Sequence, residues 1–299
     1  MWLLQSAQPN LKLRRFVRAY AQRTASIPGE PISESVPARL EPTLEFEFGD
    51  TFDVTFTDGN RLTTPLCTIV GPQTHLRGSV LLTGSVESFA IFFQPAGFTQ
   101  LFGIPLRELM DRAYDATTVV GTEVRGLWHR LKACASFLER IALVERVLLK
   151  TASQISITVT INDHVNHILA SGGAVSIAAL ADRMAVSPRQ LERRFAREIG
   201  VPPKSYARIA RFQTALDAKL ANPRRTWLDI AHQLQYHDQM HMVHDFSALA
   251  NGSPNRVLAT VGDMRPDALT RNYPAHTPQK EQPVYVSQID AADNRLGKL

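Results

Sequence analysis

One short segment in the C-terminal third of the chain gathers side chains that could hydrogen-bond to nucleic-acid bases. Ser187 is a favourable helix N-cap, Pro188 a favourable first helical residue and Gly200 a favourable stop, so a helix is predicted up to about Ile199. Apolar residues recur within it at a spacing of four and mark its buried stripe. The polar residues away from that stripe are Arg189, Gln190, Glu192 and Arg193.

These side-chain types can read base edges in a DNA major groove. Arginine donates two parallel hydrogen bonds to guanine, and glutamine or glutamate can pair with adenine or cytosine. A reading helix of this kind is supported by a second helix joined to it through a tight turn. Ser176 caps a preceding helix with an apolar stripe from Ile177 to Met184, and the segment 185–187 breaks that helix. The sequence therefore predicts a helix-turn-helix unit.

A second unit of the same kind follows along the chain. A Pro-Pro pair starts a long helix that runs to about Ala221, and Thr226 caps a short helix after it. The segment 235–237 breaks that short helix, and Asp238 caps another. Two helix-turn-helix patterns joined by one long helix are a more specific signal than a single pattern.

Positive charge is concentrated in this same region. The whole chain has a formal net charge of +5, whereas the stretch from Ser187 to Arg225 holds ten basic and three acidic residues. The remainder of the chain is therefore slightly acidic. Binding to a phosphate backbone requires such a local basic patch. Candidate phosphate contacts are Ser187, Arg197, Lys204, Arg208, Arg224 and Arg225.

Two long runs in this region carry a family resemblance. The runs SIAALADRMAVSPRQLERRFAREIGVPPKSYARIARFQTAL and DIAHQLQYHDQMHMVHDFSALANGSPNRV resemble the DNA-binding domain of the AraC/XylS family of transcription regulators, over about residues 158–260. The resemblance implies that two helices enter successive major grooves. It places Arg193 and its polar neighbours on the first of them. On the second it places Gln239, Met240, His241 and His244.

The second unit departs from the family pattern. Gln235 stands where a turn glycine is usual, and a positive φ there would strain a residue with a side chain. Polar or basic groups are commoner where Met240 and His244 stand, and Met240 cannot hydrogen-bond to a base edge. We therefore expect weaker base discrimination from the second unit.

Several residues of the domain have two possible roles. Arg208 and Arg211 match a family pattern, and they could hydrogen-bond within the domain or contact phosphates. The histidines at 237, 241 and 244 could form a metal-binding face with Asp238. A zinc-protease site is excluded because the glutamate of an HExxH motif is absent. Between a structural or regulatory metal site and a capped helix with its histidines facing DNA or solvent, the capped helix is the preferred interpretation.

The N-terminal half predicts an α+β domain, with a small antiparallel β-barrel or sandwich plus helices. Its alternating segments and turn signals favour short strands, and longer apolar periodicities favour helices. A pocket is predicted inside the strands, lined by Phe46, Phe48, Phe56 or Phe92. Expected strands are 44–48, 52–56, 66–70, 79–83 and 86–93; expected helices are 11–22, 97–102, 105–111, 121–135 and 138–151; 24–42 is expected to be a loop.

The expected organisation is a sensor or association domain over 1–151, a linker over 152–157, an all-α DNA-binding domain over 158–262 and a flexible tail over 263–299. The run FAIFFQPAGFTQLFGIPLRELMDR is similar to part of an uncharacterised sensor domain found ahead of AraC-type modules. That resemblance implies a regulatory role. The apolar face of 138–151 is interpreted as part of the core, with a dimer interface as the second choice.

Composition places the chain among globular proteins, with 44% hydrophobic and 20% charged residues in 299. Two cysteines, Cys67 and Cys134, are too few for a disulfide framework, and both read as packing residues rather than redox sensors. Neither a convincing signal peptide nor an apolar run of membrane-spanning length is found. We therefore expect a cytoplasmic protein.

The function expected from these features is sequence-specific DNA binding in transcription regulation, without catalysis, cofactor or metal. Duplex DNA is the expected partner, and further partners consistent with the resemblance are a small-molecule effector, RNA polymerase and a second copy of the chain. One alternative is an enzymatic N-terminal barrel fused to a DNA-binding module, and another is a nonspecific DNA-binding protein. Titratable residues available to the enzymatic alternative are Glu45, Glu47, Asp50, Asp53 and His75.

Overall fold

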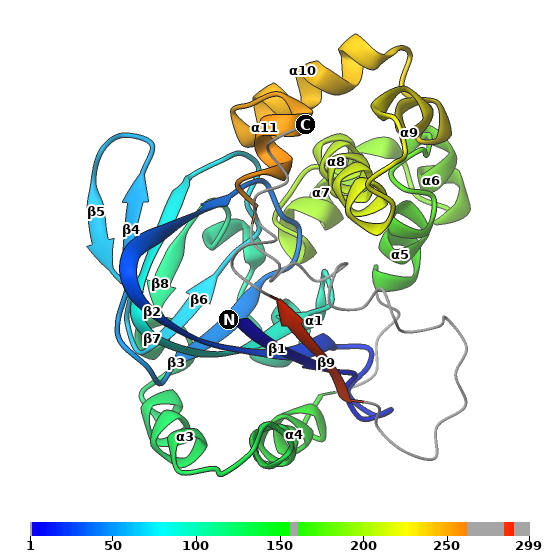
Figure 1. The fold of residues 1–299 in the computed structure, drawn as a ribbon. Coiled ribbons are helices and arrows are strands. Elements are labelled where there is room, and N and C mark those ends of the chain that lie inside the picture. The colour runs from blue at the N-terminus through cyan, green and yellow to red at the C-terminus, as the bar shows by residue number, and fades with distance from the viewer. Residues whose placement is uncertain (1, 156–160, 262–283, 290–299) are drawn as a thin grey trace.

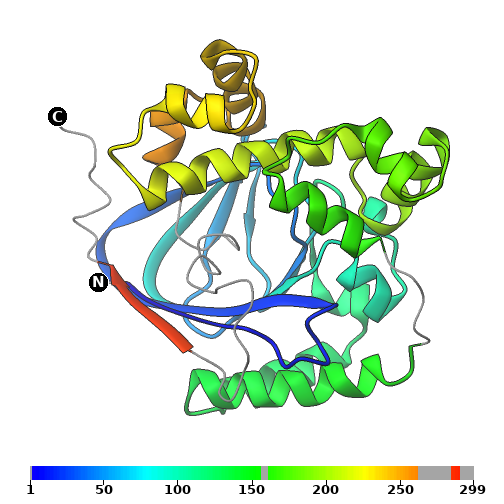
Figure 2. The ribbon, with the colours of Figure 1, turned by 90° about the vertical axis from the view of Figure 1, so that its right-hand side faces the viewer.

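A computed structural model describes residues 2–155, 161–261 and 284–289. An antiparallel sheet with helices on one side forms the N-terminal part, and a group of helices forms the C-terminal part (Figure 1). Figure 2 shows the C-terminal helices along one end of the sheet and α3 and α4 at the opposite end. Among the described residues, no helix is long and apolar enough to cross a membrane.

The sheet is built around two long strands, β2 and β7, which pair with each other antiparallel. Its strands follow the order β8-β6-β3-β7-β2-β1-β9, while β4 pairs with β7 and with β5. The two outer strands of that order do not pair with each other, so the sheet is open and not a closed barrel. The strands are β1 (Trp2–Ala7), β2 (Val17–Val36), β3 (Thr43–Glu47), β4 (Asp53–Phe56), β5 (Arg61–Thr63), β6 (Cys67–Val70), β7 (Gly78–Phe93), β8 (Ala113–Asp115) and β9 (Val284–Ile289).

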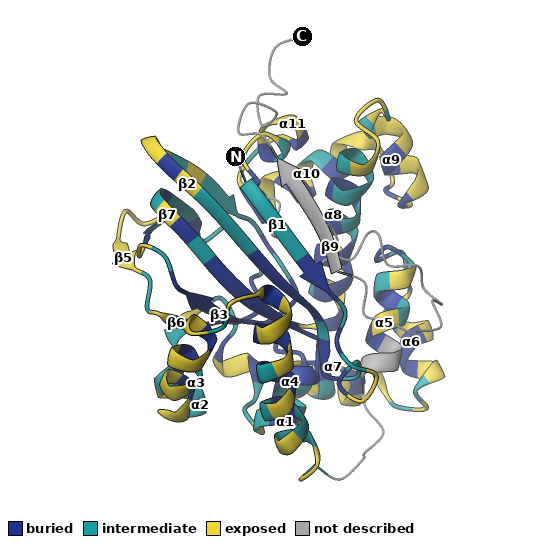
Figure 3. Cartoon of the chain, turned by 60° about the horizontal axis from the view of Figure 1, so that its bottom comes forward, coloured by how far each residue is buried: buried dark blue, intermediate teal, exposed yellow. Residues whose placement is uncertain are grey.

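One face of the sheet is covered by helices, as Figure 3 shows for α1, α3 and α4. Phe46 of β3 and Phe89 of β7 are fully buried there, with ring centroids 6.3 Å apart. Trp128 of α3 packs against Phe48 with ring centroids 6.1 Å apart. The N-terminal helices are α1 (Gly97–Phe102), the 3-10 turn η1 (Leu106–Glu108), α2 (Ala116–Val120), α3 (Glu123–Lys132) and α4 (Phe137–Ala152).

The C-terminal helices pack around α8, which contributes a long buried stripe. Tyr206, Phe212 and Leu216 of α8 are at most 1% exposed. Phe246 of α10 meets Phe212 edge-on, with ring centroids 4.8 Å apart. The helices are α5 (Asn162–Ala170), α6 (Ile177–Arg183), α7 (Pro188–Glu198), α8 (Pro203–Ala221), α9 (Trp227–Gln233), α10 (Gln239–Ala250) and α11 (Pro254–Leu258).

The predicted fold class is confirmed, with an antiparallel sheet plus helices followed by an all-α domain. The predicted helix over 11–22 and the predicted loop over 24–42 are wrong, because β2 runs through both. Two of the four prolines that suggested a loop, Pro28 and Pro31, fall where the β2–β7 register shifts, between Ile27 and Ile32. The two strands expected between 79 and 93 form one continuous strand.

Some expected boundaries fall partly outside the described residues. The predicted linker over 152–157 begins at the last residue of α4, and 156–160 are not described. Within the predicted tail, Val284–Ile289 forms β9 and pairs antiparallel with β1, while 263–283 and 290–299 are not described. The apolar residues Ile141, Val144 and Leu148 of α4 are buried against the sheet, as expected for core.

Candidate nucleic-acid interface

The first helix-turn-helix unit comprises α6 and α7, and its turn is held by backbone hydrogen bonds. Ser176 caps α6 by accepting a hydrogen bond from the Ala179 backbone N–H. After α6, Ala185 adopts φ 50° and Val186 donates its N–H to the Ala181 carbonyl. This is the Schellman arrangement that ends a helix abruptly. The chain can therefore turn into α7 within a few residues.

The start of α7 is fixed by a reciprocal capping box. Ser187 accepts a hydrogen bond from the Gln190 backbone N–H, and the Gln190 side-chain oxygen accepts one from the Ser187 backbone N–H at 2.8 Å. This pairing satisfies two otherwise orphaned donors. Gln190 thus fixes the start of the helix through its side-chain carbonyl oxygen, a role that the sequence analysis missed.

The exposed face of α7 carries all four predicted base-reading residues. Arg189, Gln190, Glu192 and Arg193 are exposed, whereas Leu191 and Phe195 on the opposite face are fully buried. Within the described residues neither Arg189 nor Arg193 forms an ion pair. Arg194 and Arg197 both contact the Glu198 carboxylate, at 3.2 and 2.8 Å. The first two arginines are therefore the freer donors on this helix.

The second unit, α9 and α10, repeats the same local architecture. Thr226 caps α9 and Asp238 caps α10, the latter by accepting the His241 backbone N–H at 2.7 Å. Gln235 adopts φ 55°, and Tyr236 donates its N–H to the Ala231 carbonyl. Gln235 therefore has the positive φ that strains a residue with a side chain, at the position equivalent to Ala185 in the first turn.

The exposed start of α10 differs chemically from that of α7. Gln239, His241 and His244 are exposed, and Met240 is 58% exposed. Hydrogen bonds from the His241 backbone and the His237 ring lower the pKa of Asp238. Among the described residues, no three His, Cys, Asp or Glu side chains are grouped so that they could hold a metal ion.

The candidate phosphate contacts divide into outward-facing and internally engaged groups. Lys204 and Arg224 are exposed, and Ser187 is exposed at the α7 N-cap. Arg225 is half-buried, and Arg197 is 65% exposed although it contacts Glu198. Arg208 is different because its Nε lies 2.5 Å from an oxygen of Asp245, whose side chain is only 4% exposed.

Both arginines on the long helix link α8 to the rest of its domain. Arg208 joins α8 to α10 through Asp245. Arg211 donates a hydrogen bond to the Gly173 carbonyl at 3.0 Å and lies over the Tyr236 ring, 5.2 Å from its centroid. Of the two readings left open for them, these contacts favour hydrogen bonding within the domain.

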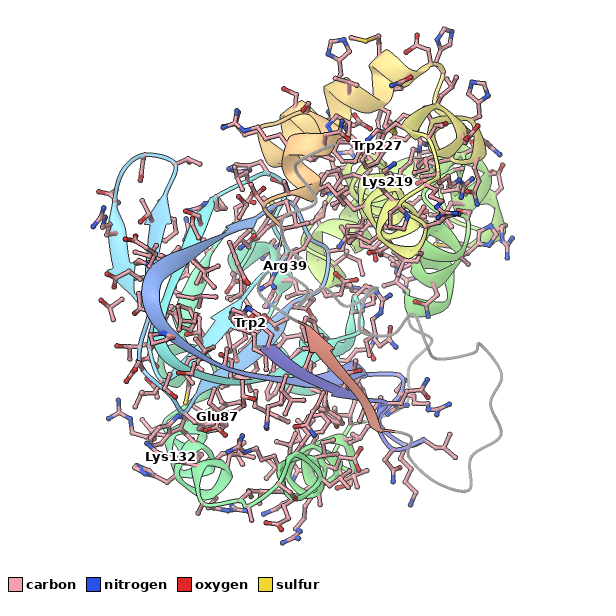
Figure 4. All side chains as sticks on the ribbon, in the orientation of Figure 1. Trp2, Arg39, Glu87, Lys132, Lys219 and Trp227 are labelled. Carbon is pink, nitrogen blue, oxygen red and sulfur yellow. The ribbon has the colours of Figure 1, made fainter. Side chains whose placement is uncertain are left out.

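Lys219 is likewise engaged at the end of α8. Its ammonium donates to the carbonyls of Pro223 and Arg225 and lies 5.5 Å from the Trp227 ring centroid. Figure 4 shows Lys219 and Trp227 close to one another at the junction of α8 and α9. The basic excess of this region therefore serves the structure of the domain as well as its surface charge.

The helical domain is attached to the sheet at both of its units. Near the first unit, Gly200 adopts φ 80° and approaches Leu106 so closely that a Cβ would lie 2.8 Å from its carbonyl. Near the second unit, Ala38 donates its N–H to the Leu249 carbonyl at 3.0 Å. Between them Gln213 of α8 donates to Glu41, a carboxylate that is 1% exposed.

A cavity of about 200 Å³ lies between the sheet and α8. Phe56 and Phe92 line it together with Phe212, Gln213 and Leu216 from α8. A pocket is therefore present against the strands, but it lies between the sheet and α8 and not inside the strands as predicted.

Two of the four predicted pocket residues are wrong. Phe46 and Phe48 pack against the helices on the opposite face, because strand side chains alternate and Glu45 and Glu47 occupy the cavity face instead. The other titratable residues of the enzymatic alternative are engaged locally. Asp50 accepts from Ser85, Asp53 from Thr63, and His75 lies beside Asp111.

The two cysteines are free thiols. Burial raises the pKa of Cys67 to about 12, which opposes thiolate formation. This agrees with its reading as a packing residue.

Comparisons with known proteins cover both parts of the chain. A helix-turn-helix domain matches residues 180–260, and a domain of unknown function, DUF6597, matches residues 5–115. No curated protein matches the chain.

Among solved structures, a variant of apo ToxT from Vibrio cholerae is 9% identical with a TM-score of 0.48, covering 85% of this chain and 100% of that chain. Wild-type ToxT from the same organism, bound to an unsaturated fatty acid, is 9% identical with a TM-score of 0.47, covering 82% and 96%. The AraC-like transcriptional activator CuxR is 12% identical with a TM-score of 0.28, covering 68% and 78%.

Proposed function

Residues 180–260 form an AraC-type helix-turn-helix domain, and on this premise we propose that the protein is a sequence-specific, DNA-binding transcription regulator. The observation that carries the proposal is the exposed face of α7, where Arg189 and Arg193 are free of ion pairs among the described residues and stand beside Gln190 and Glu192. Each unit has a capped second helix with its first turn exposed, which is the part that contacts base edges in such domains.

The two units have different proposed roles. Arg193 and Arg189 donate bidentate hydrogen bonds to guanine from the first groove. Gln239, His241 and His244 contact the second groove, where Met240 offers only an apolar surface, for example to a thymine methyl group. Lys204, Arg224, Arg225 and Arg197 contact phosphates. The expected site is asymmetric and has two parts about one helical turn apart, roughly 34 Å.

We further propose that a small molecule controls DNA binding from the cavity between the sheet and α8. The cavity wall includes Phe212, Gln213 and Leu216, and α8 connects the two helix-turn-helix units. A ligand there would contact both the sheet and the helix that sets the spacing of the units. RNA polymerase and a second copy of the chain are further proposed partners, and the proposed location is the cytoplasm.

The direct test is selection of bound sequences from random duplex DNA with the full chain at near-physiological salt. We expect enrichment of one two-part motif. The nonspecific alternative predicts no enrichment and binding that only fades as salt rises. A selection repeated with cell extract metabolites added would show whether enrichment depends on an effector.

The variants Arg193→Ala and Arg146→Ala make a matched pair for that selection. Both remove one exposed arginine, but Arg146 lies on α4 of the N-terminal part. Arg193→Ala should relax one half of the motif and leave the other half unchanged, whereas Arg146→Ala should leave both halves unchanged. Equal relaxation in both halves would contradict the assignment of Arg193 to one groove.

The enzymatic alternative has less support. Of its five candidate residues, only Glu45 and Glu47 reach the cavity, and the AraC-type domain belongs to a family of regulators rather than enzymes.

A further inference from the structure

The cavity beneath α8 contains a buried carboxylate, Glu47, whose hydrogen-bond partner among the described residues is a neutral hydroxyl. Glu47 is 3% exposed, and its side-chain oxygen accepts a short hydrogen bond from the Ser88 hydroxyl. Within the described residues no ion pair to Glu47 is formed. A buried carboxylate is costly unless charge or several hydrogen bonds compensate it. Glu47 therefore leaves an unmet demand for positive charge or further donors.

The guanidinium groups along the cavity meet that demand only in part, because Arg23 lowers the pKa of Glu47 without forming an ion pair with it. Arg23 is paired with Glu34 at 2.7 Å, and Arg39 with Glu45 at 3.2 Å. Arg77 lies over the Phe56 ring, 5.6 Å from its centroid. With Glu47 and Asp115, the lining holds four carboxylates against three guanidinium groups. When Glu47 is ionised, the cavity lining therefore carries one more negative charge than its guanidinium groups balance.

Two buried acceptors add to this demand for donors. Within the part of the chain that the structure describes, the side-chain oxygens of Gln73 and Gln213 have no hydrogen-bond partner, although these residues are only 6% and 4% exposed. Both line the cavity. Gln213 is fixed in orientation because its amide nitrogen donates to Glu41 at 3.3 Å. A ligand with several N–H groups would satisfy acceptors that the protein leaves open.

Much of the remaining lining is apolar. Phe92 is 1% exposed and Ala90 2% exposed, and Val54, Phe56 and Leu216 are among the other apolar residues of the wall. A ligand of about the cavity's volume, 200 Å³, would thus have a small apolar body.

We propose that this cavity binds a small organic cation, an amine carried on an apolar or aromatic group, with its ammonium against the Glu47 carboxylate and its apolar part against Phe92 and Leu216. The proposal rests on the proposed effector control and specifies the chemical class of the effector. The ammonium donates up to three hydrogen bonds, and the open oxygens of Gln73 and Gln213 are acceptors for it or for further N–H groups of the ligand.

The ionisation of Glu47 is consistent with this assignment. Burial raises its pKa to about 7, with Glu45 adding to the increase and Arg23 and the Ser88 hydrogen bond opposing it. A bound cation would favour the charged form of Glu47 and repay part of its burial cost.

The test is isothermal titration calorimetry of the full chain with three probes of similar shape: phenethylamine, phenethyl alcohol and phenylpropionate. We expect the amine to bind at least about tenfold more tightly than the alcohol, since a charge-assisted hydrogen bond replaces a neutral one. Glu47→Gln should remove this preference, whereas Glu30→Gln, at an exposed position of β2, should keep it. Equal binding of amine and alcohol, tighter binding of the carboxylate, or no binding of the amine by the wild-type chain would each overturn the proposal.

The preference of the wild-type chain for the amine over the alcohol tests the proposal even if Glu47→Gln does not fold. Failure here is distinguishable from failure of the proposed function, because calorimetry reads the cavity without DNA. A two-part DNA motif obtained without an amine preference would contradict only the proposal that the ligand is an organic cation. An amine preference without a DNA motif would instead sink the proposed regulator.

Discussion

Replacing Arg208 by alanine separates the two roles open to this residue, an internal pair or a phosphate contact. The guanidinium lies 2.5 Å from a carboxylate oxygen of Asp245, and this contact joins α8 to α10. The Asp245 side chain is 4% exposed, whereas that of Arg208 is 43% exposed. The substitution therefore leaves a buried carboxylate without its cation.

The expected loss of stability follows from these exposures. Breaking a fully buried ion pair by removing one partner costs about 3–5 kcal/mol. Because Arg208 is nearly half exposed, water can enter its place and solvate Asp245, so we expect about 2 kcal/mol for Arg208→Ala. Asp245→Ala leaves a cation that water already reaches, so we expect a smaller loss, about 1 kcal/mol. The coupling energy of the pair should be about 1–2 kcal/mol.

Urea denaturation of the wild type, both single variants and the double variant gives this coupling energy directly. DNA affinity measured over a range of salt concentrations tests the alternative, in which Arg208 contacts a phosphate. A phosphate contact predicts unchanged stability, weaker binding and a salt slope reduced by about one. Unchanged stability of Arg208→Ala, or single-variant losses that simply add in the double variant, would refute the reasoning from the pair.

Three further predictions concern the turns and the cavity. Gln235→Gly should raise the unfolding free energy by about 1 kcal/mol, because glycine adopts the φ of 55° without a Cβ penalty; a lower value in urea denaturation would contradict the strain. Ser187→Ala should lower the unfolding free energy by about 1 kcal/mol through loss of the α7 cap. An unchanged unfolding free energy would mean that the capping box contributes nothing to stability. The pKa of Glu47 is raised from 4.5 to about 7 in the folded protein, so its contribution to stability is present below pH 4.5 and is lost as the pH rises through 7. Relative to the wild type, Glu47→Gln should therefore gain about 3 kcal/mol between about pH 4 and about pH 8 in pH-dependent denaturation, and a constant difference would contradict the shift.

The helix-turn-helix units could be predicted from sequence because their signals are local. Ser187, Pro188 and Asp238 act on the backbone within three residues, and apolar spacing of four residues specifies one helix face. The role of Gln190 in the capping box is equally local and could have been found from its place three residues after Ser187. The pairing of Arg208 with Asp245 spans 37 positions and has no local signal.

The long strand β2 escaped prediction for a different reason. Val17, Tyr20 and Ala21 are all buried, so the segment is covered on both faces and lacks the alternation that marks a half-exposed strand. Its pairing with β7 overrides the local preference of Pro28 and Pro31, which lie at the register shift.

The polar wall of the cavity also depends on contacts between residues that are far apart in the sequence. Alternation along β3 placed Glu45 and Glu47 on one face, and that face normally reads as solvent. Here α8, more than 150 positions away, lines the same cavity as this face, and Glu47 is only 3% exposed.

The most direct test of the central claim is the affinity of Arg193→Ala for the selected DNA site, measured beside the wild type and Arg146→Ala. A bidentate contact to a base predicts a loss of about 1–3 kcal/mol on the selected site for Arg193→Ala, with little further loss when the contacted base pair is also changed. Arg146→Ala should bind as the wild type does. Equal affinities of all three proteins for the selected site, or equal losses on selected and random DNA, would contradict a regulator that reads sequence through α7.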